Sequence, residues 1–253
     1  MAQYNQIHDA GLSSTATARR LESSRAIFRK VTGKNYDTMS QHFPYELLED
    51  AEELSGYRGW SEDVYRDFLA MRRGKMSADE FSDKYRYRRA ILSVDMTGFT
   101  SSAINIGELA AFYRILDAQT VCIPILKGFG AELIRCFADD VVAIFDSPDA
   151  AIDAAFEIHR RIDHFNNSDL ASDHPTHCCI GIGYGEVFAI GPNLAQGDEM
   201  NRSSKLGEDI ARAKETLLTE RAFESLKQRT DIHFELQTSD DQLFPFYRAV
   251  SSA

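Results

Sequence analysis

The chain has 253 residues, of which 43% are hydrophobic and 26% are charged, and its formal net charge is −11. This composition is typical of a soluble protein with enough apolar side chains to form a sizeable core. The negative charge argues against broad binding to nucleic acid or to an anionic membrane, because both surfaces repel an acidic protein.

Two further features concern the compartment. Residues 1–20 lack a continuous apolar stretch, and no later window approaches the roughly 18–20 apolar residues that span a bilayer. The cysteines lack the paired CxxC spacing of zinc or redox sites, so we expect reduced thiols in the core; they are Cys122, Cys136, Cys178 and Cys179. We therefore expect a cytoplasmic protein.

Residues 21–88 have helical patterns separated by breaks. Apolar spacing predicts helices at 21–31, 43–54 and 61–73, and Ser61 is a plausible N-cap for the last of these. No catalytic spacing occurs in this part of the chain. We therefore expect residues 1–88 to form a helical segment with a dimerisation or regulatory role.

From Arg89 onward, strands and helices alternate. Residues 89–95 predict a buried strand, and Asn105 with Glu108 resembles a capping box. The helix that follows is expected to continue to about Leu126, with Pro124 bending or ending its last turn.

The remaining predicted elements complete an α+β pattern. They are strands at 128–137 and 141–147 around a turn at 138–140, a helix at 149–165, a strand pair at 177–191 turning through Gly183 to Gly185, helices at 200–214 and 219–229, and strands at 232–236 and 244–250. The order β, α, ββ, α, β is a split βαβ arrangement. We predict a ferredoxin-like domain of residues 89–253 with an antiparallel-rich sheet.

Two acids occupy equivalent positions in this pattern. Asp95 ends the first strand, and Asp139 lies in the turn between the next two. Neighbouring strands in a ferredoxin-like sheet would bring the carboxylates together, where they repel each other unless a cation lies between them. Mg²⁺ or Mn²⁺ suits such an oxygen-only site. The alternative is that Asp95 is only a turn residue.

The loop after Asp95 reads MTGFT. Thr97, Gly98 and Phe99 follow Met96 and offer successive backbone N–H groups beside a glycine. Such a concave run of donors can hold phosphate oxygens.

Three motifs in this order resemble the class III nucleotidyl cyclases, the adenylate and guanylate cyclase family. They are VDMTGFT at 94–100, FGAELIRCFADDVVAIF at 129–145 and GDEMNRSSKLGED at 197–209. The resemblance covers about residues 89 to 250. It implies the catalytic domain of these enzymes, which convert a nucleoside triphosphate into a 3′,5′-cyclic nucleotide and pyrophosphate.

The resemblance also implies residue roles. Asp95 and Asp139 would hold two divalent cations, with the backbone carbonyl of Met96 as an extra ligand. Asn201 would orient the ribose, and Lys205 stands where the family has its transition-state arginine. In the family the metal-binding acids come from one subunit and the helix with the Asn201 and Lys205 positions comes from the other, which implies a homodimer with two composite sites.

The residues that select the base depart from both purine patterns. The family's first base position is Arg135 and its second is Leu194, so neither the adenine pair nor the guanine pair is present. Arg135 only donates hydrogen bonds, which suits the carbonyl acceptors of uracil or cytosine, and Leu194 offers neither donor nor acceptor. Ser93 adds a small polar group where the family often packs an apolar side chain on the purine.

This combination resembles the bacterial pyrimidine cyclases of Pycsar antiphage defence. It implies synthesis of cyclic UMP from UTP, with cyclic CMP as the alternative, and a product that activates a separate effector protein.

Other differences from the family pattern weaken the expected binding of the triphosphate. Ala138 replaces a glycine, and Cys179 replaces the family's phosphate-binding arginine. The lysine that many members of the family carry near their final strands has no counterpart in ELQTSDDQLFPF at 235–246. Two alternatives therefore stay open: an adenylate or promiscuous cyclase, and a catalytically silent cyclase-like dimer that senses a nucleotide.

Overall fold

The computed structural model describes residues 50–56, 60–97, 104–105, 107–169, 175–191, 194–238 and 244–252. Ala51–Ala253 form one compact unit, separate from the unit Met1–Asp50. The helix predicted at 21–31 lies outside the described residues. The boundary predicted between residues 88 and 89 falls within strand β1 (Arg86–Met96).

Within the described residues, three short helices precede the sheet: α3 (Ala51–Gly56), α4 (Glu62–Arg72) and α5 (Ala78–Tyr85). A full capping box starts α5, because the Ser77 hydroxyl accepts from the Glu80 N–H and the Glu80 carboxylate accepts from the Ser77 N–H. Ser61 occupies the N-cap of α4 but makes no side-chain capping bond. An apolar cluster joins α4 and α5 to strand β4 (Cys178–Gly191); it contains Val64, Phe81, Tyr85 and Ile190.

The sheet has eight strands within the described residues. They are β1, β2 (Leu133–Phe137), β3 (Asp140–Phe145), β4 (Cys178–Gly191), β5 (Leu194–Gln196), β6 (Thr216–Thr219), β7 (Ile232–Gln237) and β8 (Phe246–Ser251). Their order is β2-β3-β1-β4-β6-β8-β7, with β5 pairing to β4. Only β4 and β6 pair in parallel, so the predicted antiparallel-rich α+β sheet is confirmed.

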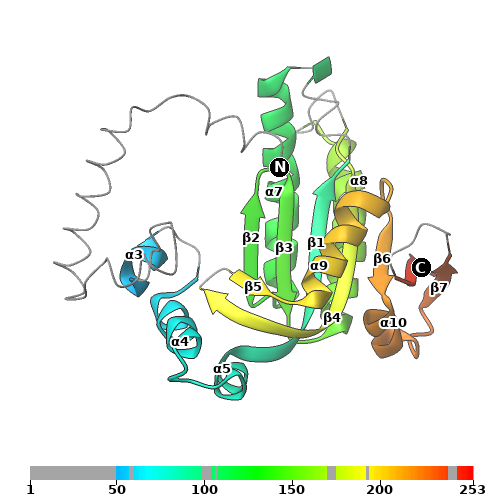
Figure 1. Ribbon diagram of the computed structural model, residues 1–253. Coiled ribbons are helices and arrows are strands. Elements are labelled where there is room, and N and C mark those ends of the chain that lie inside the picture. Colours follow the sequence, from blue (N-terminus) through cyan, green and yellow to red (C-terminus); the bar gives the residue numbers. More distant parts are fainter. Residues whose placement is uncertain are drawn as a thin grey trace, which may run out of the picture. The chain divides into compact units, whose positions relative to one another are not determined.

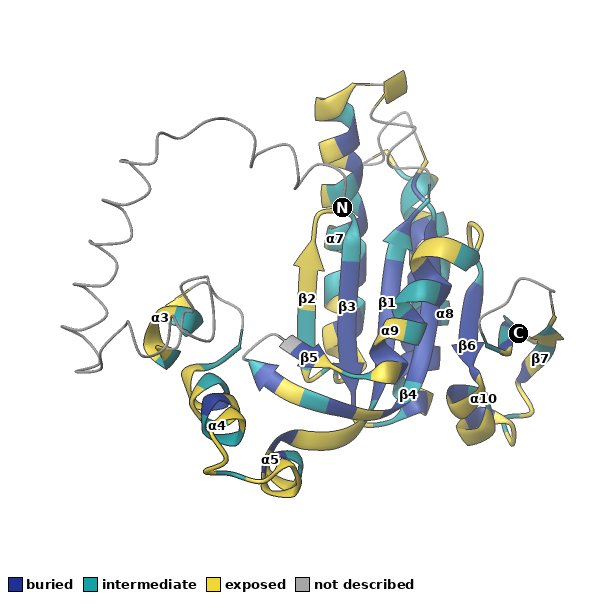
Figure 2. Ribbon diagram, viewed as in Figure 1, coloured by how far each residue is buried: buried dark blue, intermediate teal, exposed yellow. Residues whose placement is uncertain are grey.

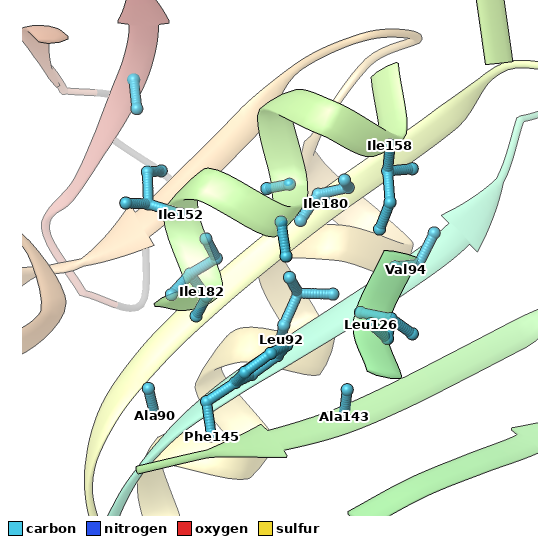
Figure 3. Packing of buried hydrophobic residues seen from close by; sticks show 14 of the residues in the cluster. Ala90, Leu92, Val94, Leu126, Ala143, Phe145, Ile152, Ile158, Ile180 and Ile182 are labelled. Carbon is cyan, nitrogen blue, oxygen red and sulfur yellow. The ribbon is translucent and has the colours of Figure 1, made fainter. Parts of the chain in front are cut away.

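Helices α7 (Glu108–Gly128) and α8 (Pro148–Asn166) cover one face of this sheet (Figure 1). Leu92 and Val94 of β1 pack there against Leu126 of α7 and Ile158 of α8 (Figure 3). Strand β3 and the middle of β1 are mostly buried, whereas β2 at the edge of the sheet is partly exposed (Figure 2).

The opposite face carries helix α9 (Asp198–Ser204), which continues as a π-helix, η1 (Lys205–Ile210). Met200 of α9 packs there in a cluster with Ile91 of β1. Because side chains alternate along a strand, Ser93 and Asp95 lie on the same face of β1 as Ile91. The sheet therefore presents Asp95 toward the side of α9 and η1.

Several boundaries differ from the predictions. Helix α7 begins after Gly107, whose φ is 90°, so Asn105 is not its N-cap, and the helix runs through Pro124 to Gly128. The predicted strand pair at 177–191 is wrong, because β4 is one continuous strand of 14 residues through Gly183 and Gly185. The predicted helix at 200–214 ends at Ile210, and α10 (Glu220–Leu226) is shorter than expected.

Two expectations from composition also change. Helix α7 is long and apolar enough to cross a membrane by length and composition alone, contrary to the prediction that no window comes close. In the fold its residues Ala118, Cys122 and Leu126 are buried against the domain. All four cysteines are free, as predicted, but Cys136 is exposed and does not belong to the core.

Candidate active site

The two acids singled out by the sequence lie in one electrostatic cluster. Asp95 is half-buried near the end of β1, and Asp139 lies in the turn between β2 and β3. The pKa of Asp95 is raised to about 7, with burial as the largest cause and the charges of Asp139, Asp140 and Glu208 acting in the same direction, while a hydrogen bond from the Met96 backbone lowers it. The fold therefore brings negative groups from three segments to the same place.

Asp140 and Glu208 were not anticipated from the sequence. Burial raises the pKa of the Asp140 carboxyl, and Asp139 adds to the effect, whereas Arg135 and a side-chain hydrogen bond with Asp95 lower it. Burial raises the pKa of Glu208, with Asp140 as the next contribution. Strand register could have revealed Asp140, because Val94 pairs with Val141 and the next positions along β1 and β3 are Asp95 and Asp140. No local pattern marks Glu208.

A hard divalent cation fits this group of carboxylates. Asp95, Asp139, Asp140 and Glu208 offer carboxylate oxygens, and a cation would relieve the repulsion that raises the pKa values of Asp95 and Asp140. Among the residues that the structure describes, no three His, Cys, Asp or Glu side chains are arranged as a complete metal site. Met96 as a whole is only 2% exposed.

The turn that carries Asp139 has a strained residue. Ala138 has a φ of 51°, in the left-handed region that favours glycine, at the position where the resemblance leads one to expect glycine. Its carbonyl accepts a hydrogen bond of 3.0 Å from the Gln119 side chain of α7. The turn thus has a glycine-like backbone conformation although alanine occupies the position.

The loop after Asp95 is described only at its start. The Thr97 N–H and hydroxyl both donate to the His177 carbonyl at 3.0 Å, and its own carbonyl accepts from Arg114 at 3.4 Å. These bonds tie the first loop residue to the segment before β4 and to α7. Gly98 and Phe99 lie outside the described residues.

The residues proposed for base selection are on separate elements. Arg135 is exposed on β2, and its charge lowers the pKa of Asp140, so its guanidinium lies near the acids. Leu194 is the first residue of β5. Ser93 is fully buried, and η1 packs on its backbone at Gly207. In this conformation Ser93 has no surface with which to contact a base.

Asn201 and Lys205 lie one helical turn apart, where α9 passes into η1. Asn201 is exposed, and its side chain has no hydrogen-bond partner within the described part of the chain. The Lys205 ammonium donates to the Asp209 carboxylate. The Asn201 side chain is thus open to solvent, whereas the Lys205 ammonium is paired within the chain.

Cys179 occupies the predicted arginine position in β4. Its thiol is buried and donates to the Ala211 carbonyl at 3.1 Å, and burial together with Asp95 raises its pKa to about 12. The position therefore supplies no positive charge for a triphosphate.

No protein-family model matches the chain, and no curated protein matches it. The adenylyl cyclase CyaB from P. aeruginosa aligns with a TM-score of 0.56 and 17% identity, over 66% of this chain and 96% of that one.

Two further solved structures align over the same share of this chain. The guanylate cyclase domain of RhGC from Catenaria anguillulae, in complex with GTP, gives a TM-score of 0.55, 15% identity and 98% coverage of that chain. An adenylate/guanylate cyclase/hydrolase from Silicibacter pomeroyi gives 0.51, 22% and 99%. The described unit therefore has the fold of adenylyl and guanylyl cyclase catalytic domains.

Proposed function

We propose that this protein is a nucleotidyl cyclase that converts UTP into 3′,5′-cyclic UMP and pyrophosphate. The observation that carries the proposal is the proximity of Asp95 to Asp139 of the β2–β3 turn and to Asp140 at the start of β3, on a cyclase fold. In the reaction the ribose 3′-oxygen bonds to its own α-phosphorus, and the bond from that phosphorus to pyrophosphate breaks.

Two divalent cations, Mn²⁺ or Mg²⁺, are part of this proposal. Asp95, Asp139 and the Met96 carbonyl would hold them. When bound, such ions lower the pKa of an attacking hydroxyl and neutralise phosphate charge. The clustering of half-buried carboxyls supports the assignment, because their repulsion is costly without a counter-charge.

The chain's own groups would bind and orient the nucleotide. Asn201 would hold the ribose so that its 3′-oxygen faces the α-phosphorus, and Lys205 would leave Asp209 to neutralise charge developing on the phosphate. The backbone of Thr97, Gly98 and Phe99 would hold phosphate oxygens.

Base selection is assigned to Arg135. The guanidinium is exposed and close to the acidic cluster, which supports a contact with a bound nucleotide. Its donors match the carbonyl oxygens of uracil, and those of cytosine as the alternative. Leu194 would line the pocket without polar contact. The burial of Ser93 removes it from the direct contacts of this proposal.

A homodimer with composite sites is the proposed active form. An apolar surface supports self-association: Leu109, Phe112, Tyr113 and Leu116 of α7 and Phe137 of β2 are each more than half exposed. Exposed apolar side chains at this density are typical of association surfaces. A second subunit would bring its Asn201 to the acids of the first.

The cellular role follows from the Pycsar resemblance alone. We propose a cytoplasmic enzyme of antiphage defence whose cyclic product activates a separate effector protein.

A second candidate function is a silent cyclase-like dimer that senses a nucleotide. Cys179 favours it, because a buried neutral thiol replaces a phosphate-binding arginine.

The test is a panel of the four nucleoside triphosphates with Mn²⁺, with pyrophosphate release measured and the product identified by mass. The proposal predicts cyclic UMP as the main product. Preferred turnover of ATP would support an adenylate cyclase instead, and nucleotide binding without any cyclic product would support the silent sensor.

A further inference from the structure

One buried carboxylate on α9 has no role in the proposed chemistry. The side chain of Glu199 is only 3% exposed, although it lies two residues before the exposed Asn201. Burying a carboxylate is costly unless hydrogen bonds and opposite charges compensate it. The groups around Glu199 must therefore compensate its buried charge.

The Glu199 carboxylate joins three elements. Its Oε2 accepts from the Thr219 hydroxyl at 2.6 Å and from the Tyr184 N–H at 3.2 Å, and its Oε1 lies 3.6 Å from the Arg221 guanidinium. Tyr184 belongs to β4, Thr219 ends β6, and Arg221 belongs to α10. A single side chain thus anchors the first turn of α9 to the sheet and to the next helix.

Strand β4 has glycines at the two positions that lie against Glu199. A Cβ added to Gly183 would lie 2.6 Å from the Glu199 carbonyl oxygen, and one added to Gly185 would lie 2.6 Å from its Cγ. Both distances are too short for real carbon contacts, so only glycine lets α9 approach β4 this closely. This close approach explains why the two glycines lie within a strand and not in a turn.

We propose that Glu199 is a positioning residue that fixes α9 on β4 and thereby sets where Asn201 and Lys205 are presented to the acids of a partner subunit. The inference rests on the proposed cyclase function and its composite sites. Glu199 contacts no reacting atom in this role. It acts through Asn201, and misplacement of a catalytic group by about 1 Å can reduce turnover about a hundredfold.

The experiment compares Glu199→Ala with Glu199→Gln in the full chain. Alanine leaves the donors of Thr219 and Tyr184 unpaired, and we expect kcat to fall at least about tenfold with little change in KM. Glutamine keeps an acceptor for both donors, so it should retain most of the activity. Equal losses in the two variants would overturn the proposal.

Mixed dimers separate positioning from general damage. Asp139→Ala lacks a metal acid but has a native α9, whereas Glu199→Ala has native acids and a displaced α9. An equal mixture should recover about a quarter of wild-type activity, because half of the dimers contain one intact composite site. The matched control pairs Asp139→Ala with Asn201→Ala, which should recover to the same level.

The outcomes distinguish the role of Glu199 from the existence of composite sites. Recovery with Asn201→Ala but not with Glu199→Ala overturns the role of Glu199 alone. Failure of both mixtures, with an active wild-type protein, overturns the composite sites and the inference with them. If Glu199→Ala does not fold, Thr219→Val replaces it, with Thr219→Ser as the control that keeps the hydroxyl; failure of Thr219→Val to complement Asp139→Ala counts against the proposal in the same way.

Discussion

Asp95 of β1 and Cys179 of β4 are register partners in an antiparallel pair. Both groups have raised pKa values, that of Asp95 about 7 and that of Cys179 about 12, with burial as the main cause in each case. A neutral thiol thus stands beside the acid where the cyclase pattern has an arginine. The local charge at Asp95 is negative, and a cation bound from solution would have to balance it.

The first prediction concerns Asp95→Asn in metal-free protein. A carboxyl whose pKa is higher in the folded state stabilises the fold at low pH, and this contribution is lost as the pH rises from about 4 through about 7. Asparagine removes the repulsion, so at pH 8 the variant should be more stable by about 1–2 kcal/mol after solvent screening.

Thermal melts at pH 5 and pH 8 measure this effect. The stabilisation should be larger at pH 8, while turnover with Mn²⁺ is abolished. A variant that is less stable than wild type at pH 8 would show that the acids do not repel one another as described.

The second prediction concerns the turn before Asp139. Ala138→Gly relieves a φ of 51°, which costs an L-residue about 1 kcal/mol, although glycine loses more entropy on folding. We expect a net gain in unfolding free energy of up to about 1 kcal/mol with activity retained. Urea denaturation measures it, with Ala131→Gly as the matched control outside the left-handed region. A large loss of stability would contradict the assigned turn geometry.

The main elements of this fold could be predicted from the sequence because their signals are local. The apolar run of β1, the amphipathic spacing of α8 and the turn at Asp139 each occur within one short stretch. The strand through Gly183 and Gly185 was wrongly predicted as a strand pair, because the two glycines were interpreted as a turn. They are needed for close approach of Glu199, which lies on another element and leaves no local signal.

In the candidate site, too, some residues were predictable from local sequence and others depend on tertiary packing. Asp95 and Asp139 were predictable from motif order, whereas the participation of Asp140 and Glu208 depends on register and on how η1 packs on β1. The burial of Ser93 likewise results from the contact between Gly207 and the backbone of β1, which no local pattern reveals. Strand β6, with the short sequence TLLT, was missed because four residues carry too weak a pattern.

The third prediction tests the assignment of Arg135. Because its donors are expected to contact uracil carbonyls, Arg135→Ala should lower kcat/KM for UTP about tenfold or more while changing that for ATP much less. Initial rates with each nucleotide measure the ratio. Arg66→Ala, at an exposed arginine of α4, is the control. An unchanged preference for pyrimidines in Arg135→Ala would refute the pocket assignment.

The fourth prediction concerns a histidine away from the site. Burial lowers the pKa of His159 to about 4, with Lys214 and His177 acting in the same direction and Asp163 and the Glu215 backbone opposing it. Its ring nitrogen lies 3.0 Å from the Thr216 hydroxyl. Since the folded pKa is below the unfolded one, the neutral ring contributes stability above pH 6.5 that is lost as the pH falls through about 4.

Replacing His159 by Gln keeps a polar partner for Thr216 without the titration. Between pH 7 and pH 4 the wild type should lose about 3 kcal/mol more unfolding free energy than the variant. Parallel acid-denaturation curves for the two proteins would contradict the buried neutral ring.

The central claim is that Asp95 and Asp139 jointly hold divalent cations beneath a nucleotide's phosphates. Titration of Mn²⁺ followed by electron paramagnetic resonance, with an unreactive UTP analogue present, measures this directly. We predict about two bound ions per site in the wild type and affinity at least about tenfold weaker in Asp139→Ala, with no change in Asp79→Asn, an exposed acid of α5. Wild-type binding of Mn²⁺ by Asp139→Ala would contradict the account.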